Sequence, residues 1–353
     1  MTDFVTIRDL LMLVMEHQAS DLHLTIHANP ILRINGELIS LSDKPVFTEE
    51  SLKKIIYSIL TDSQKEKFER DKELDFSFSM PQMDRFRVNV HIQRGIVEAA
   101  FRRIPRDIPT FEYLGLPTVV QELARLPNGL VLITGPTGVG KSTTLAAMVD
   151  LINREKKKMI ISIEDPIEFV HGNKSSIIKQ REVFSDTLSF AEALKRALRQ
   201  DPDIIMVGEL RDLETIATAL TAAETGHLVL ATLHTPDAPQ TIQRIIDVFP
   251  PYQQQLVRLL LADCLQGVVS QLLLPRKDVA GRVIAVEIMV ANSAVRNLIR
   301  EGQVAHIPTI IQTGSKYGMK SMDKALKELY AAGIISYETA VEKAHHKEEF
   351  LKL

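Results

Sequence analysis

The amino-acid sequence predicts an α/β protein in which a smaller α+β domain precedes a mostly parallel sheet and a helical region ends the chain. Three observations lead to this prediction. The 353 residues are enough for two or three domains. Period-two apolar alternation fills the first hundred residues, and short apolar runs alternate with helical stretches in the middle of the chain. Apolar residues make up 45% and charged residues 25%, which excludes a disordered, collagen-like or coiled-coil protein.

Residues 1–104 are typical of a small α+β domain whose sheet has helices on one side. Asn35-Gly36 stands between two apolar runs, which is the pattern of a tight hairpin turn. Thr61 and Gln64 have the spacing of a capping box, which marks the beginning of a helix. The expected elements are helices at residues 7–17 and 62–71 and strands at residues 22–26, 74–80, 86–92 and 97–104.

Residues 105–117 are predicted to be a linker, because Pro105, Pro109 and Pro117 interrupt both helices and strand ladders. An α/β core with a mostly parallel sheet is expected over residues 118–291, with short apolar runs that suit strands buried on both faces. These predicted strands are residues 130–134, 159–163, 204–207 and 228–232. A C-terminal helical region is expected over residues 292–353, with helices at residues 294–301, 321–332 and 337–344.

Charge and cysteine content exclude several classes of protein. The 42 basic and 45 acidic residues leave a net charge of −3, so no global basic excess indicates nucleic-acid binding. The single cysteine, Cys264, excludes an intramolecular disulfide and a four-cysteine zinc module, and it suits a reducing, cytoplasmic environment. The first residues lack the pattern of a secretory signal. Polar side chains interrupt the most apolar stretch, residues 256–274, so no transmembrane segment is expected.

A glycine-rich loop between an expected strand and an expected helix is the decisive motif. Its residues are Gly135, Pro136, Thr137, Gly138, Val139, Gly140, Lys141, Ser142 and Thr143. Glycines at these spacings let backbone N–H groups converge on phosphate oxygens. Lys141 is expected to reach the β- and γ-phosphates of ATP, and the Ser142 hydroxyl is expected to ligate Mg²⁺. The motif therefore predicts a P-loop enzyme that hydrolyses ATP.

Acidic and histidine side chains follow the predicted core strands. Glu164 and Glu209 come where two strands end, and ligands of open α/β sheets bind at the carboxyl ends of strands. One carboxylate is expected to hold Mg²⁺ or its water shell, and the other to orient or deprotonate the attacking water. Asp165 is better explained as a helix N-cap or a solvated loop residue. His227 and His234 flank the strand at residues 228–232, and His234 is a candidate sensor of the γ-phosphate.

Several arginines lie on the last two strands of the N-terminal domain, namely Arg85, Arg87, Arg94, Arg102 and Arg103. One interpretation is the solvated polar face of a half-buried sheet. Another is an arginine finger, donated to the γ-phosphate bound by a neighbouring subunit. The sequence pattern leaves both interpretations open.

The order of motifs along nearly the whole chain resembles the secretion ATPases of type IV pili and type II secretion. The matching blocks are SDLHL (20–24), RFRVN (85–89), GPTGVGKSTT (135–144), SIEDPIE (162–168), GELRD (208–212) and GHLVLATLHT (226–235). The resemblance implies a RecA-like ATPase core and a PAS-like N-terminal domain, assembled as a homohexameric ring at the cytoplasmic face of the inner membrane. The platform protein PilC would be its partner there.

The same resemblance implies roles for individual residues. Glu164 would be the catalytic base, and Glu209 the acid near Mg²⁺. His227 and His234 would form a histidine pair at the site. Arg85 and Arg102, with Arg87 as a weaker candidate, would act on the nucleotide of the neighbouring subunit.

Within that family the chain is most similar to the motors that retract pili. Residues 294–301, AVRNLIRE, differ from the retraction block AIRNLIRE only at Val295. Periodicity alone offers another interpretation, an apolar stripe of core residues with a solvated Arg296. Assembly motors resembling PilB carry a tetracysteine element, which one cysteine cannot supply. The resemblance therefore implies retraction, with pilin disassembly and twitching motility.

Other functions compete with this prediction. A PilU-like accessory motor would share the same blocks and would depend on a partner motor. For a retraction motor, PilU-like or PilB-like motors are candidate partners. An assembly or secretion ATPase ranks lower. A nucleic-acid translocase is disfavoured by the absence of tryptophan and the 5% aromatic content. A non-hydrolysing ring is disfavoured because Lys141, Ser142, Glu164 and Glu209 are all present.

Overall fold

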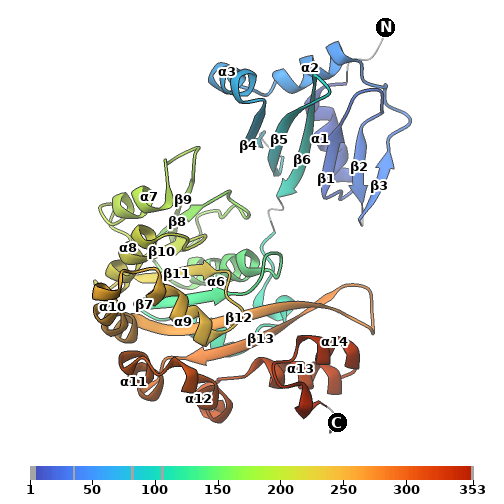
Figure 1. The fold of residues 1–353 in the computed structure, drawn as a ribbon. Coiled ribbons are helices and arrows are strands. Elements are labelled where there is room, and N and C mark those ends of the chain that lie inside the picture. The colour runs from blue at the N-terminus through green and yellow to red at the C-terminus, as the bar shows by residue number, and fades with distance from the viewer. Residues whose placement is uncertain (1–4, 35, 81–82, 105–106, 351–353) are drawn as a thin grey trace. The chain divides into compact units, whose positions relative to one another are not determined.

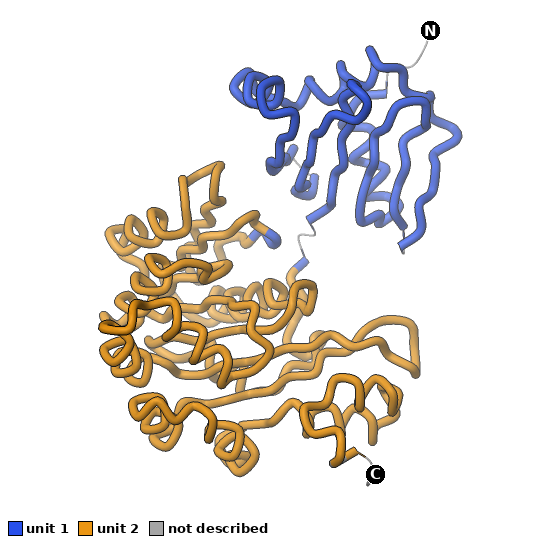
Figure 2. Tube along the Cα trace, viewed as in Figure 1, with its two compact units in different colours: residues 1–107, 168–170 blue, residues 108–167, 171–353 orange. Residues whose placement is uncertain are grey.

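The computed structural model describes residues 5–34, 36–80, 83–104 and 107–350. The chain forms two compact units (Figure 2). Unit 1 comprises Met1–Asp107 with Glu168–Val170, and unit 2 comprises Ile108–Ile167 with His171–Leu353. Part of the predicted linker, Phe111–Leu114, is the short helix α4. Pro105 lies outside the described residues, and the functional division into four segments stays a prediction.

Unit 1 is built on one antiparallel six-stranded sheet with the strand order β3-β2-β1-β6-β5-β4 (Figure 1). Its strands are β1 (Asp21–Leu24), β2 (Ile31–Ile34), β3 (Glu37–Ser40), β4 (Glu73–Ser79), β5 (Arg85–Gln93) and β6 (Ile96–Ile104). Its helices are α1 (Ile7–Glu16), α2 (Glu49–Tyr57) and α3 (Asp62–Asp71). The sequence pattern predicted all of these except α2.

Local sequence signals explain how these elements begin and turn. Strands β2 and β3 pair as the predicted hairpin, and Gly36 takes the positive φ of +91° that such a turn requires. Asn35, the other predicted turn residue, lies outside the described residues. The predicted capping box at α3 is confirmed, since the Thr61 N–H donates to Gln64 Oε1 at 2.9 Å and the Gln64 N–H donates to Thr61 Oγ1 at 3.3 Å.

Unit 2 contains a seven-stranded sheet with the order β13-β12-β7-β11-β10-β8-β9. Its strands are β7 (Gly129–Thr134), β8 (Met159–Glu164), β9 (Ile177–Glu182), β10 (Ile204–Val207), β11 (Leu228–Leu233), β12 (Leu265–Pro275) and β13 (Arg282–Val290). Neighbouring strands are parallel except β13, which is antiparallel to β12. The predicted mostly parallel sheet is confirmed.

Helices flank this sheet and continue beyond it (Figure 1). They are α5 (Thr118–Ala124), α6 (Lys141–Glu155), α7 (Phe190–Ala197), α8 (Leu213–Glu224), α9 (Ala238–Asp247), α10 (Pro251–Cys264), α11 (Ser293–Glu301), α12 (Ile307–Thr313), α13 (Met322–Ala331) and α14 (Tyr337–Lys343). The three helices predicted at the C-terminal end correspond to α11, α13 and α14. The sequence pattern did not indicate α12.

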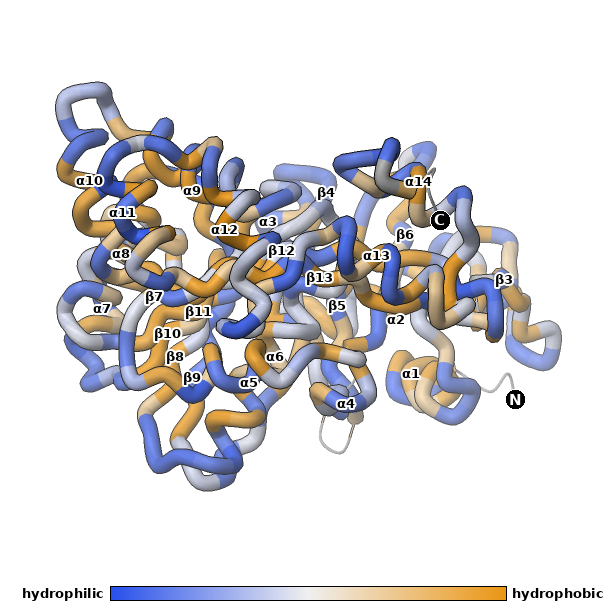
Figure 3. Tube along the Cα trace, turned by 90° about the horizontal axis from the view of Figure 1, so that it is seen from below, coloured by the Kyte–Doolittle hydropathy of each residue, from blue (hydrophilic) through white to orange (hydrophobic). Residues whose placement is uncertain are grey.

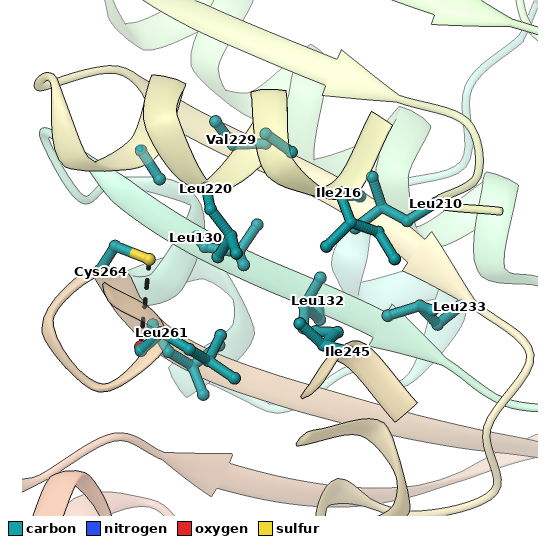
Figure 4. Packing of buried hydrophobic residues seen from close by; sticks show 14 of the residues in the cluster. Leu130, Leu132, Leu210, Ile216, Leu220, Val229, Leu233, Ile245, Leu261 and Cys264 are labelled. Atoms are coloured by element: carbon teal, nitrogen blue, oxygen red, sulfur yellow. Dashed lines mark hydrogen bonds between the residues drawn. The ribbon is translucent and has the colours of Figure 1, made fainter. Parts of the chain in front are cut away.

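The core of unit 2 has two layers, one on each face of the sheet. Leu130 and Leu132 of β7 pack in one buried cluster with Leu220 of α8 (Figure 4), whereas Val131 and Ile133 pack in the other. Alternate residues of a strand point to opposite faces, so a strand covered on both sides is apolar at every position. The hydropathy colouring shows this apolar interior along β8, β10 and β11 (Figure 3).

The apolar stretch at residues 256–274 does not form one element. It comprises the end of α10 and most of β12. Among the described residues, no helix is both long enough and apolar enough to cross a bilayer. Cys264 lies where these elements meet, and burial raises the pKa of its thiol to about 12.

Candidate active site

The glycine-rich loop connects the end of β7 to the beginning of α6. Gly135, Gly138 and Gly140 have φ values of +137°, +82° and +90°, which L side chains rarely adopt. A Cβ at Gly135 would also lie 2.4 Å from the carbonyl oxygen of Gln271 on β12. The loop conformation therefore depends on glycine at these positions, and Gly135 further depends on the neighbouring strand.

Lys141 is the first residue of α6, and its side chain is buried. Its ammonium donates to the carbonyl oxygens of Gly135 at 2.7 Å and Pro136 at 2.9 Å. The positive end of a 15-residue helix, its first-turn N–H groups and a lysine therefore lie together. This combination suits the phosphates of a nucleotide. Ser142 and Thr143 lie in the same first turn of α6.

The protein oxygens near the loop suit a magnesium ion that a nucleotide also ligates better than an ion ligated by protein alone. Among the residues that the structure describes, no group of three or more histidine, cysteine, aspartate or glutamate side chains could hold a metal. In P-loop sites the ion instead takes one or two protein oxygens together with phosphate oxygens. Ser142 and Glu209 are the predicted protein ligands.

His234 links the second acidic residue to the loop. Glu209 follows β10, and its Oε1 lies 3.3 Å from Nε2 of His234. The other ring nitrogen, Nδ1, lies 3.3 Å from Nζ of Lys141 and 3.4 Å from Oγ1 of Thr137. A lysine ammonium only donates and a carboxylate only accepts, so this geometry suits a ring with its proton on Nε2. The structure thus brings together four residues that the sequence analysis selected.

Arg211 connects Glu209 to the first acidic motif. Its Nε donates to Glu209 Oε2 at 2.7 Å, and its Nη1 lies 3.6 Å from Asp165 Oδ2. Asp165 is thus ion-paired, which differs from the N-cap or solvated loop residue that the sequence pattern favoured. The sequence analysis included Arg211 in the GELRD block but assigned it no role, because a single arginine beside an acidic residue is a weak signal.

Glu164 is the last residue of β8 and is only 7% exposed. Its Oε1 accepts a hydrogen bond from Ser162 Oγ at 2.6 Å and another from Gln180 Nε2 at 3.0 Å. The sequence analysis missed Gln180 entirely. No local signal identifies it, because β9 has a polar sequence, IIKQRE, and its neighbour in the sheet comes from a separate segment.

Comparison with known proteins identifies the family of this chain. A family model described as "Type II/IV secretion system protein" matches residues 5–342. The chain belongs to this family. The resemblance to secretion ATPases is confirmed, and so is the predicted fold class. One relative in the family is the Type IV pilus retractation ATPase PilT of Pseudomonas aeruginosa, which is 50% identical over 344 residues, covering 98% of this chain and 99% of the relative.

Two further members of the secretion family are informative. The Type IV pilus ATPase PilU of Pseudomonas aeruginosa is 40% identical and covers 94% of this chain and 87% of the relative. The crystal structure of the pilus retraction motor PilT with bound ADP superposes with a TM-score of 0.93 at 47% identity, covering 99% of this chain and all of that one. PilT is therefore similar in sequence and fold along the whole chain.

The structure separates the second histidine of the pair from the P-loop of its own chain. His227 precedes β11, and its Nδ1 lies 2.9 Å from the carbonyl oxygen of Ala222. Leu228, the next residue, pairs with Gly129 at the beginning of β7, whereas the P-loop follows the end of β7. A catalytic role for His227 therefore stays a prediction.

Arg85, Arg87 and Arg102, the arginines to which the resemblance assigned a role, lie on one face of the sheet of unit 1. Arg87 of β5 is directly opposite Arg102 of β6, which in turn is opposite Asp21 of β1. Arg102 Nε donates to Asp21 Oδ1 at 2.8 Å. Burial raises the pKa of Asp21, but hydrogen bonds from Ser20 and Arg102 outweigh this effect and hold the pKa below its usual value. Arg85 lies two residues before Arg87, and the trans role of these arginines stays a prediction.

Proposed function

We propose that this chain is an ATPase motor that powers the retraction of type IV pili. The observation that carries the proposal is a glycine-dependent P-loop whose Lys141 contacts His234, which in turn contacts Glu209. The chain has this site in a sequence that is 50% identical to PilT along nearly its whole length. ATP would be the substrate, and twitching motility the process that its hydrolysis supports.

The residues of this site have separate tasks in hydrolysis. Lys141 and the first-turn N–H groups of α6 bind the β- and γ-phosphates, and Ser142 with Glu209 would hold Mg²⁺. The ion would neutralise charge that develops on the phosphates. Glu164 accepts a proton from water as the water oxygen bonds to the γ-phosphorus. The bond from that phosphorus to the bridging oxygen breaks, which yields ADP and phosphate.

The assembly is part of the same proposal, and family membership supports it. Six chains would form a ring at the cytoplasmic face of the inner membrane, with PilC as the partner that transmits movement to the pilus. Arg85 and Arg102 of one subunit would stabilise the transition state at the P-loop of the next. His234 would register the γ-phosphate through its contacts with Lys141 and Glu209.

Fibre counts and twitching in a strain that lacks the gene test this proposal. Loss of twitching with more surface pili is the result expected of a retraction motor. Bald cells would contradict retraction and indicate an assembly motor. Unchanged fibres and motility would contradict an indispensable retraction motor and favour a PilU-like accessory protein. Complementation with Lys141→Ala should fail to restore twitching, because the variant lacks a phosphate contact but keeps its fold.

A further inference from the structure

Two side chains from neighbouring strands converge on one oxygen of Glu164. Ser162 of β8 and Gln180 of β9 are direct partners in the parallel register. Both donate to Oε1 of Glu164, Ser162 through its hydroxyl at 2.6 Å and Gln180 through its amide at 3.0 Å. Hydrogen bonds to an ionised carboxylate are stronger than those between neutral groups, and two donors on one oxygen restrict rotation of the carboxylate.

The orientation of the Gln180 amide is determined by its two partners. Its Oε1 accepts the backbone N–H of His171 at 2.8 Å, and its Nε2 donates to Glu164. Rotating the amide by 180° would place its NH₂ against the His171 N–H and its carbonyl oxygen against a carboxylate. One end of the side chain therefore holds the loop at His171 while the other end holds Glu164.

The surroundings of Glu164 make such an anchor necessary. The side chain is 7% exposed, so water contributes little to its orientation. Glu182 is its direct partner on β9 and Asp165 follows it in the chain, and both are acidic. Glu182 accepts the N–H of Ile167 at 3.1 Å, and Asp165 lies 3.6 Å from Arg211. A carboxylate cannot donate a hydrogen bond to another carboxylate. Ser162 and Gln180 supply the donors to Glu164 Oε1 that Glu182 and Asp165 cannot.

We propose that Gln180, together with Ser162, is a positioning residue that fixes the Glu164 carboxylate for proton acceptance from the attacking water. The inference rests on the proposed function, in which Glu164 is the base. It adds that hydrolysis depends on a strand at the edge of the sheet, β9, which carries none of the family motifs described above. Displacing a reacting group by about 1 Å can lower a rate about 100-fold.

Gln180→Glu separates the two functions of the side chain. The variant keeps the shape and the oxygen that accepts the His171 N–H, but it replaces the donor to Glu164 with an acceptor. We expect kcat for ATP to fall about 100-fold, while KM and the affinity for a fluorescent ATP analogue stay close to wild type. Ser162→Ala should lower kcat in the same direction. Gln180→Met removes both contacts and should also lower the melting temperature.

The matched control is Gln255→Glu, the same substitution at an exposed position of α10, which should leave kcat unchanged. If Gln180→Glu retains the wild-type kcat while Gln180→Met only loses stability, Gln180 has a purely structural role and the proposal is overturned. Glu164→Gln completes a double-mutant comparison with Gln180→Glu. Against that background Gln180→Glu should cost nothing further, since the carboxylate it positions is gone.

The same variants test the role of Glu164 as the base separately from the positioning role of Gln180. If Glu164→Gln hydrolyses ATP at the wild-type rate, Glu164 is not the base, and the mechanism under the proposed function is wrong. If Glu164→Gln abolishes turnover but Gln180→Glu does not change it, the mechanism stands and only the positioning role is wrong. A fall in kcat for both, without additivity, supports both.

Discussion

Arg296 Nη1 lies 2.7 Å from the backbone carbonyl oxygen of Asp263, at the C-terminal end of α10. The same nitrogen donates to the carbonyl oxygen of Ala262, and Nη2 donates to Gln266 Oε1 at 3.1 Å. The last carbonyl groups of a helix lack partners within the helix, and a cation there is favourable. Burial lowers the pKa of Arg296. Its side chain is therefore partly buried and differs from the solvated arginine that periodicity alone predicts.

Replacing Arg296 with alanine should therefore destabilise unit 2 whatever its role in retraction. The carbonyl oxygens at the end of α10 would lose their donors, and we expect the free energy of unfolding to fall by about 1–3 kcal/mol. Urea denaturation of the purified variant measures this change. Arg296→Lys restores the charge but not the forked geometry, so it should recover only part of the loss.

The same variant tests the retraction block, because ATPase activity and twitching can be measured separately. Intact ATP hydrolysis with lost twitching would support a retraction-specific function of α11. Normal twitching would contradict it and leave Arg296 as a helix cap.

His234→Ala should lower the rate of ATP hydrolysis about 100-fold, because Glu209 and Lys141 lose the ring that lies between them. The carboxylate and the ammonium would then be free to take other positions. Steady-state kinetics and circular dichroism together check this expectation. A wild-type kcat in a folded His234→Ala protein would contradict the bridging role.

Mixed rings test whether Arg102 acts on a neighbouring subunit. Lys141→Ala and Arg102→Ala should each be inactive as homogeneous assemblies. In a mixture, an intact P-loop from the Arg102→Ala chain would meet an intact arginine from the Lys141→Ala chain, and part of the activity should return. If the mixture stays as inactive as its components, action in trans by Arg102 is wrong.

Arg102 is 70% exposed on its side chain, so loss of its ion pair with Asp21 should cost only about 0.5–1 kcal/mol in stability. Unfolding curves of Arg102→Ala can therefore distinguish a catalytic defect from a folding defect. Asp21→Asn is the matched variant, because it removes the ion pair and keeps the arginine. It should retain ATPase activity if the guanidinium itself is what the neighbouring site uses.

His171 should make the protein less stable in acid. Burial lowers the pKa of its imidazole to about 4; of the two smaller effects, the charge of Asp150 raises this pKa and the charge of Lys174 lowers it. The unfolded chain binds this proton near pH 6.5, so the folded state loses stability as the pH falls from about 6.5 toward 4, by up to about 1.4 kcal/mol per pH unit. Above pH 6.5 the contribution is constant.

Urea denaturation of wild type and His171→Leu at pH 7 and pH 5 isolates this contribution. The loss of stability between the two pH values should be smaller in His171→Leu, because this variant lacks the imidazole that the unfolded chain protonates. The other titratable groups are the same in both proteins. Equal losses in both proteins would show that His171 does not titrate as its burial implies.

Local patterns in the sequence were sufficient for most of the fold. The strands β7, β8, β10 and β11 were predicted because a strand covered on both faces is apolar at every position. The P-loop was predicted because its glycines and lysine are contiguous in the chain. Elements that were not predicted include β9, β12, β13, α2 and α12. The sequence of β9 is largely polar, and α2 lacks a long apolar stripe.

The sequence by itself determined which residue types stand at the ends of the core strands, and therefore the chemistry that the site supports. Only the tertiary structure decided which of them meet. The sheet order places β9 beside β8, so that Gln180 reaches Glu164, and the end of β11 beside β7, so that His234 reaches Lys141 while His227 stays at the far end. These contacts depend on strand order and register, which arise from packing of segments distant in the chain and leave no local periodic signal.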